Sequence, residues 1–101
     1  VLDEMRASGA DVLSLDWRVD VAAAAQRVGA SASLQGNLDP CALHAPAAQI
    51  AAWVREIAEA ARPARGHVLN LGHGCLADTP VDGVRAFVDA AKALPPREPF
   101  A

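Results

Sequence analysis

Three short apolar runs alternate along the chain with stretches in which apolar side chains recur every three or four positions. The runs are residues 11–16, 32–36 and 67–71, and no proline interrupts them. Runs of this length are typical of buried strands, whereas the three-to-four spacing is typical of helices with one buried face. Because strand and helix follow each other three times, the pattern predicts an α/β fold with three parallel strands and right-handed crossovers.

Start and stop signals bound the first two of these helices. Asp20 is the expected N-cap of a helix over residues 21–28, and Gly29 stands where that helix should end. Pro46 can occupy the first turn of a second helix, which should end near residues 62–63 because proline cannot continue it. The expected apolar stripe of this second helix is Ile50, Trp53, Val54 and Ile57.

The last helix is predicted to open with Thr79 as its N-cap, Pro80 as its first residue and Asp82 at the third position. Its expected buried face is Val84, Phe87, Val88 and Ala91. The proline-rich residues 95–99 are predicted to form a non-helical end. The turn before the second helix is predicted over residues 37–40 (NLDP).

The length of 101 residues allows one domain at most. Residues 1–6 show neither an initiator methionine nor a signal-peptide pattern, and we expect them to be the end of a helix whose beginning is missing. Two architectures fit: a small open sheet, or the last three units of an eight-unit barrel, which the missing start favours. In both, the chemistry belongs at the carboxyl ends of the strands.

Charge and cysteine content exclude several classes of function. A net charge of −3 leaves no basic face for nucleic acid. Cys41 and Cys75 have no CxxC spacing, so we expect reduced thiols in a cytoplasmic protein, and no apolar stretch reaches the roughly 20 residues that span a bilayer. No phosphate-binding glycine loop and no nucleophilic triad at motif spacing is visible.

Polar residues follow the first two strands and are candidates for a shared site. Asp16 can bind a substrate nitrogen or cap a loop amide. Trp17 is expected to pack as a lid over the rim rather than to stack on a ligand. Arg18 is expected to form a salt bridge at the rim rather than to bind a ligand carboxylate. Gln35 and Asn37 lie two apart, on one side of an extended backbone. Their amides can bind a ligand, but we expect them to tie adjacent loops together.

The third strand end holds the strongest candidate for ligand contact, His73. Gly72 and Gly74 flank it, and Asn70 completes the polar group at this strand end. The flanking glycines give the imidazole little side-chain packing, so it can hydrogen-bond a carboxylate, transfer a proton, or do both. No metal site is expected, because only Cys75 lies near this histidine and the other strand ends carry no matching Cys or His.

Three motifs on these strand ends resemble those of uroporphyrinogen decarboxylases. They are residues 12–17 (VLSLDW), 34–40 (LQGNLDP) and 70–74 (NLGHG), in the order of the last three strand-end motifs of that family, and the helix start at 78–80 (DTP) follows them. The resemblance implies that residues 1–101 are the C-terminal portion of a single (β/α)8 TIM-barrel domain. It also implies a cytoplasmic, homodimeric enzyme of tetrapyrrole synthesis without metal or organic cofactor.

The implied reaction removes the carboxyl groups of the four acetate side chains of uroporphyrinogen III and gives coproporphyrinogen III. By the resemblance, His73 contacts the substrate in the cleft. The possible rim or supporting residues are Asp16, Gln35, Asn37, Asn70, Gly72 and Gly74. The family's other principal residues are an arginine-rich segment, an aspartate facing the pyrrole NH groups, a tyrosine and a serine or threonine. These belong to more N-terminal parts, so we expect no catalytic residue within this chain and no activity from it alone.

Two alternatives come from other classes of protein. Corrinoid-dependent methyltransferases look similar on the same fold but bind zinc through His and Cys at strand ends. This chain has residues 15–17 (LDW) instead of their H-x-C pattern, and His73 where they tend to place a cysteine. A piece of barrel can also serve as a non-catalytic binding or assembly module that self-associates through exposed apolar faces.

Overall fold

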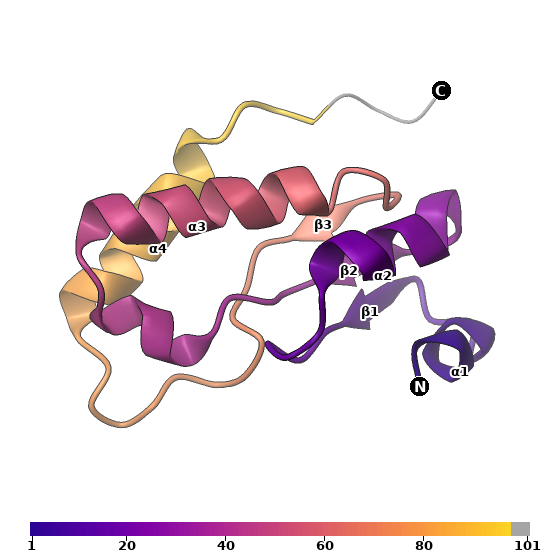
Figure 1. The fold of residues 1–101 in the computed structure, drawn as a ribbon, viewed down its shortest axis with the longest axis horizontal. Coiled ribbons are helices and arrows are strands. Elements are labelled where there is room, and N and C mark those ends of the chain that lie inside the picture. The colour runs from indigo at the N-terminus through magenta and orange to yellow at the C-terminus, as the bar shows by residue number, and fades with distance from the viewer. Residues whose placement is uncertain (98–101) are drawn as a thin grey trace.

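A computed structural model describes residues 1–97 and shows a three-stranded parallel sheet (Figure 1). Leu13 pairs with Leu34 and Leu34 with His67, in the order β1-β2-β3. An isolated parallel bridge between Leu38 and Leu71 carries the pairing of the last two strands beyond β3. The strands are β1 (Val12–Ser14), β2 (Ser33–Gln35) and β3 (His67–Val68).

Helices connect the strands and cover one face of the sheet. In Figure 1, α2 and α3 lie along the sheet, and α4 packs against α3. None of the helices within residues 1–97 is both long enough and apolar enough to cross a membrane. The helices are α1 (Leu2–Ala7), α2 (Val21–Val28), α3 (Ala47–Ala60) and α4 (Val81–Ala93), with 3-10 helices η1 (Gly29–Ser31) and η2 (Pro40–His44).

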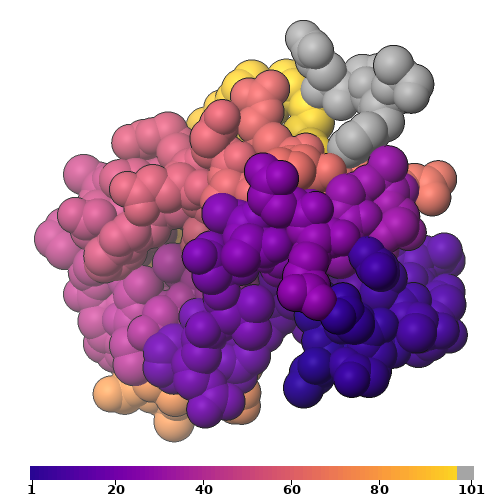
Figure 2. Space-filling view, turned by 45° about the vertical axis from the view of Figure 1, so that its right-hand side comes forward, coloured from indigo at the N-terminus to yellow at the C-terminus, as the bar shows by residue number. Residues whose placement is uncertain are grey.

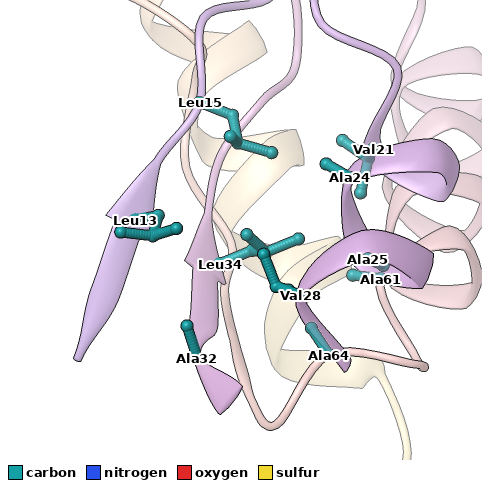
Figure 3. Close-up of a cluster of buried hydrophobic side chains, with 10 residues drawn as sticks. All are labelled: Leu13, Leu15, Val21, Ala24, Ala25, Val28, Ala32, Leu34, Ala61 and Ala64. Carbon is teal, nitrogen blue, oxygen red and sulfur yellow. The ribbon is translucent and has the colours of Figure 1, made fainter. Parts of the chain in front are cut away.

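Two clusters of buried side chains hold the layers together. The first joins β1 and β2 to α2 and to the residues that follow α3, and Figure 3 shows its strand side chains directed toward α2. It consists of Leu13, Leu15, Val21, Ala24, Ala25, Val28, Ala32, Leu34, Ala61 and Ala64. The second joins the loops after β2 and β3 to α3 and α4, and consists of Leu38, Leu43, Ile50, Val54, Leu71 and Phe87.

The helices of residues 1–97 leave the opposite face of the sheet uncovered. Val12 is 44% exposed and Val68 is 48% exposed, whereas Leu13, which alternates with Val12, is buried under the helices. The parallel three-stranded sheet confirms the predicted α/β class. The three strands of the described residues form an open sheet, so the (β/α)8 barrel stays a prediction.

The element boundaries agree well with the prediction for α2. The Asp20 carboxylate accepts hydrogen bonds from the backbone N–H groups of Ala22 and Ala23, and Gly29 ends the helix with a φ of 49°, a conformation that favours glycine. Each strand is shorter than its apolar run, although backbone hydrogen bonds between the chain segments continue past the strand ends. Pro46 lies just before α3 rather than inside its first turn. Of the predicted non-helical end, residues 98–99 lie outside the described residues.

The prediction for α4 was wrong in two respects. The helix begins at Val81 with Pro80 in the N-cap position and no side-chain cap, and the buried Thr79 hydroxyl has no hydrogen-bond partner among the described residues. Val88 is 40% exposed, and the buried positions are Gly83 and Phe87. Gly83 faces inward because its backbone lies so close to η2 that a Cβ would be 1.9 Å from the Leu43 carbonyl oxygen.

Candidate functional site

The loops that leave the three strands are joined at one edge of the sheet by backbone hydrogen bonds. The Leu15 N–H donates to the Gln35 carbonyl oxygen at 2.8 Å, which ties the first strand end to the second. The Leu38 N–H donates to the Asn70 carbonyl oxygen at 3.2 Å, and the Gly72 N–H donates back to Leu38 at 2.8 Å. The carboxyl ends of all three strands therefore form one connected surface, as parallel pairing requires.

Asn37 is buried at this edge and ties two loops together. Only 6% of the residue is exposed, and its Nδ2 donates to the carbonyl oxygens of Asp16 at 2.9 Å and Val19 at 2.6 Å. These bonds satisfy an amide that would be costly to bury unpaired. The expected tie between loops is confirmed for Asn37. The hydrogen bonds found within residues 1–97 include none from the Gln35 side chain, so its role stays a prediction.

Asp16 organises the turn after β1. Its Oδ1 accepts hydrogen bonds from the backbone N–H and the side-chain Nε of Arg18, both at 2.9 Å, and its Oδ2 lies 3.4 Å from Nη2. The Arg18 guanidinium also lies over the Trp17 ring, 5.8 Å from its centroid. The structure thus places Asp16 in the loop-capping role that the sequence left open, and Arg18 in the expected salt bridge.

The pKa of the Asp16 carboxyl is lowered from its ordinary value of 3.8 by this arrangement. The hydrogen bond from the Arg18 side chain contributes most, and the one from its backbone N–H comes next. Partial burial opposes both, and the charges of Arg18 and His73 add to the lowering. Asp16 is therefore ionised over the neutral range.

Gly72 brings the His73 loop into direct contact with the turn after β1. A Cβ at Gly72 would lie 2.2 Å from the backbone nitrogen of Trp17, so only glycine permits this approach. Figure 2 shows the orange segment after β3 beside the violet turn after β1 at the lower edge of the molecule. His73 follows on the surface with an exposed side chain.

The other predicted residues of this loop have different surroundings. A Cβ at Gly74 would meet nothing within 4 Å, so this glycine is not required by packing. The Asn70 Oδ1 accepts a hydrogen bond from the backbone N–H of Leu71 at 2.8 Å, which uses the side chain locally. The site brought together by the fold is therefore Asp16, Trp17, Arg18, Gly72 and His73, with Asn37 beneath it.

Two further histidines have structural contacts. His67 Nε2 donates to the carbonyl oxygen of Gly36 at 2.7 Å, and burial lowers the pKa of this imidazole. His44 Nε2 lies 3.7 Å from the Asp78 carboxylate, so it links η2 to the loop before α4. Within residues 1–97, no three His, Cys, Asp or Glu side chains gather closely enough to hold a metal ion.

A cavity of about 390 Å³ lies beside α3 and η2, apart from His73. Its walls are Leu38, Asp39, Cys41, Ala42, Trp53, Glu56 and Ile57. Sequence reasoning did not locate this cavity, because its walls come from a loop and a helix face whose relative placement depends on tertiary packing.

Comparison with known proteins gives one consistent result. The family model for uroporphyrinogen decarboxylase (URO-D) matches residues 1–94. A uroporphyrinogen decarboxylase of Chloroflexus aurantiacus is 49% identical over 92 residues, which cover 91% of this chain and 26% of the relative. The corresponding protein of Gloeobacter violaceus is 49% identical over 89 residues, covering 88% and 25%. That of Yersinia enterocolitica is 48% identical over 93 residues, covering 92% and 26%. The chain spans about a quarter of the length of these relatives.

Proposed function

Because the chain belongs to the uroporphyrinogen decarboxylase family, we propose that it forms the C-terminal portion of an enzyme that decarboxylates uroporphyrinogen. The reaction removes the carboxyl groups of the four acetate side chains of uroporphyrinogen III and gives coproporphyrinogen III. The observation that carries this proposal is the family match over residues 1–94, and the relatives that are nearly half identical over about nine-tenths of the chain support it.

We place residues 1–101 in a single (β/α)8 barrel domain, as its last three strand–helix units. The open face of the sheet supports this, because the inner face of a barrel is covered by strands that three units do not supply. The family resemblance further suggests a cytoplasmic homodimer that works without metal or organic cofactor.

His73 is proposed to hold a substrate carboxylate. Loss of carbon dioxide from a pyrrole acetate requires protonation of the ring and stabilisation of the resulting positive charge. His73 is exposed at the end of the third strand, and its imidazole can bind an acid side chain of the macrocycle. The described site therefore contributes one wall of the substrate cradle, and the groups that act on the ring belong to other parts of the enzyme.

The test is turnover of uroporphyrinogen III by the full-length gene product that contains this chain. We expect conversion to coproporphyrinogen III, and we expect His73→Ala to lower kcat/KM by about 10- to 100-fold, the effect of removing one hydrogen bond to a charged group. His44→Ala is the matched control, because His44 is also exposed but lies on η2 beside Asp78.

Three outcomes would contradict parts of this proposal. Failure of the unaltered protein to decarboxylate uroporphyrinogen would refute the function. Unchanged kcat/KM in the His73 variant of an active enzyme would refute the role of His73. Stoichiometric zinc that is needed for activity would favour the methyltransferase alternative.

A further inference from the structure

We propose that Arg18 is a second carboxylate-binding group of the substrate site, beside His73, and that it binds a carboxylate that is not being lost. This inference rests on the proposed function, because it takes a porphyrinogen with several acid side chains as the ligand. The juxtaposition that carries it is the Asp16–Arg18 pair on the turn that packs against the loop of Gly72 and His73.

The Arg18 guanidinium has donors to spare. A guanidinium carries five N–H groups, and Asp16 engages Nε and, at 3.4 Å, Nη2. Both N–H groups of Nη1 and one of Nη2 are left, and one N–H of each nitrogen lies parallel to the other on the far edge of the plane. The Arg18 side chain is 73% exposed, against 37% for that of Asp16, so this far edge is open to a ligand. A planar edge with parallel donors matches a carboxylate.

The same contacts hold Arg18 in place before a ligand arrives. Asp16 fixes one edge of the guanidinium, and the Trp17 ring lies against it at 5.8 Å. A long side chain that is already held loses less conformational freedom on binding than a free one. Both carboxylate oxygens of Asp16 accept hydrogen bonds from the Arg18 guanidinium. The free N–H groups of Arg18, and not the Asp16 oxygens, are therefore available to an acidic ligand.

Arg18 also lies on the same surface as His73. Gly72 lies against the backbone of Trp17, the residue between Asp16 and Arg18, and His73 is the next residue along this loop. Two groups that bind carboxylates are thus presented by the ends of β1 and β3, with the Asn37 tie between them. A ligand with more than one acid side chain can engage both at once.

The chemistry decides which carboxylate Arg18 binds. A reacting acetate gives up its negative charge as carbon dioxide leaves. A cation paired with that acetate would therefore stabilise the ground state more than the transition state and would slow the reaction. Arg18 accordingly suits a spectator carboxylate, which keeps its charge throughout. Such an interaction is equal in ground and transition states, so its loss raises KM and leaves kcat unchanged.

The experiment is steady-state kinetics of the full-length gene product with uroporphyrinogen III. Arg18→Ala is expected to raise KM about 10-fold with kcat within about twofold, the loss of one charge-assisted hydrogen bond at an exposed site. Arg18→Lys should recover part of the affinity, because it keeps the charge but not the planar edge. Arg62→Ala is the matched control, since Arg62 forms a comparable exposed pair with Glu59 on α3.

Salt separates charge recognition from a structural role. KM of the unaltered enzyme should rise with ionic strength more steeply than KM of Arg18→Ala, because screening weakens only a charge that is present. Equal salt dependence, an unchanged KM, or a lower kcat at unchanged KM would each overturn the inference. If Arg18→Ala does not fold, the same comparisons are made with Arg18→Gln, which removes the charge but keeps a side-chain donor. If the unaltered enzyme does not turn over uroporphyrinogen, the proposed function is refuted. The role of Arg18 is refuted only by the results above in an enzyme that is active.

Discussion

His67 shows at the scale of one residue how burial couples this fold to pH. Burial lowers the pKa of the imidazole below its ordinary value of 6.5, the hydrogen bond to Gly36 opposes that shift, and the charge of Arg97 adds to it. The folded state therefore releases the His67 proton at a lower pH than the unfolded state does. Between the two pKa values the unfolded state binds more protons, so stability rises with pH and is lost as the pH falls.

We expect the unfolding temperature of the full-length gene product to fall on acidification from about pH 7.5 to about pH 5.5, and part of that fall to come from His67. His67→Gln removes the titrating group while it keeps a side-chain donor for the Gly36 carbonyl. Its unfolding temperature should change less over the same range, as measured by thermal unfolding at several pH values. An identical pH dependence in the two proteins would show that His67 does not contribute.

The polar residues at the strand ends could be found from sequence, but their contacts could not. Asp16, Asn37 and His73 each follow an apolar run, and parallel strands bring such positions to one edge. The partners of Asn37 are two carbonyl oxygens from the turn after β1, and their position depends on how that turn folds in space. For Arg18 a signal existed, because an aspartate two residues before it can accept from its backbone N–H in an Asx turn.

The helices show at the next scale where periodicity stops being informative. Spacing located α2, α3 and α4, because amphipathic faces recur every three or four residues. It did not orient α4, whose rotation follows from a close backbone contact at Gly83 rather than from the sizes of Val84 and Val88. The Thr79-Pro80 pair resembles a helix start, yet Pro80 adopts an extended ψ of 135° and the helix begins one residue later.

The contact at Gly83 gives a prediction for the packing of α4 on η2. A Cβ at this position would lie 1.9 Å from the carbonyl oxygen of Leu43, which is backbone and cannot swing away. We expect Gly83→Ala to destabilise the protein by about 2 kcal/mol, although alanine favours a helix by about 1 kcal/mol over glycine. Gly74→Ala is the matched control and should change stability by less than about 0.5 kcal/mol, because nothing lies within 4 Å. Equal unfolding temperatures for the two variants would contradict the packing argument.

At the scale of the whole molecule, the resemblance predicted from three short motifs is confirmed by the family match over residues 1–94. The structure has three parallel strands that alternate with helices, which is consistent with part of the barrel of this family. The open sheet face was not visible in the sequence, because valine has the same apolar character whether it faces helices or another strand. The difference between Leu13 and Val12 becomes apparent only when the helices are seen to cover one side.

The open face predicts how residues 1–101 behave when they are produced alone. Val12 and Val68 lie half exposed on a sheet whose other side is packed, and exposed apolar sheet surface promotes association between copies. We expect the isolated chain to self-associate, as measured by size-exclusion chromatography with light scattering at several concentrations. Replacing both valines with threonine keeps the β-branched shape and makes the face more polar, so it should shift the population toward monomer. Val88→Thr on α4 is the control, because that valine is 40% exposed but lies outside the sheet. A stable monomer at all concentrations would contradict the proposal that further strands normally cover this face.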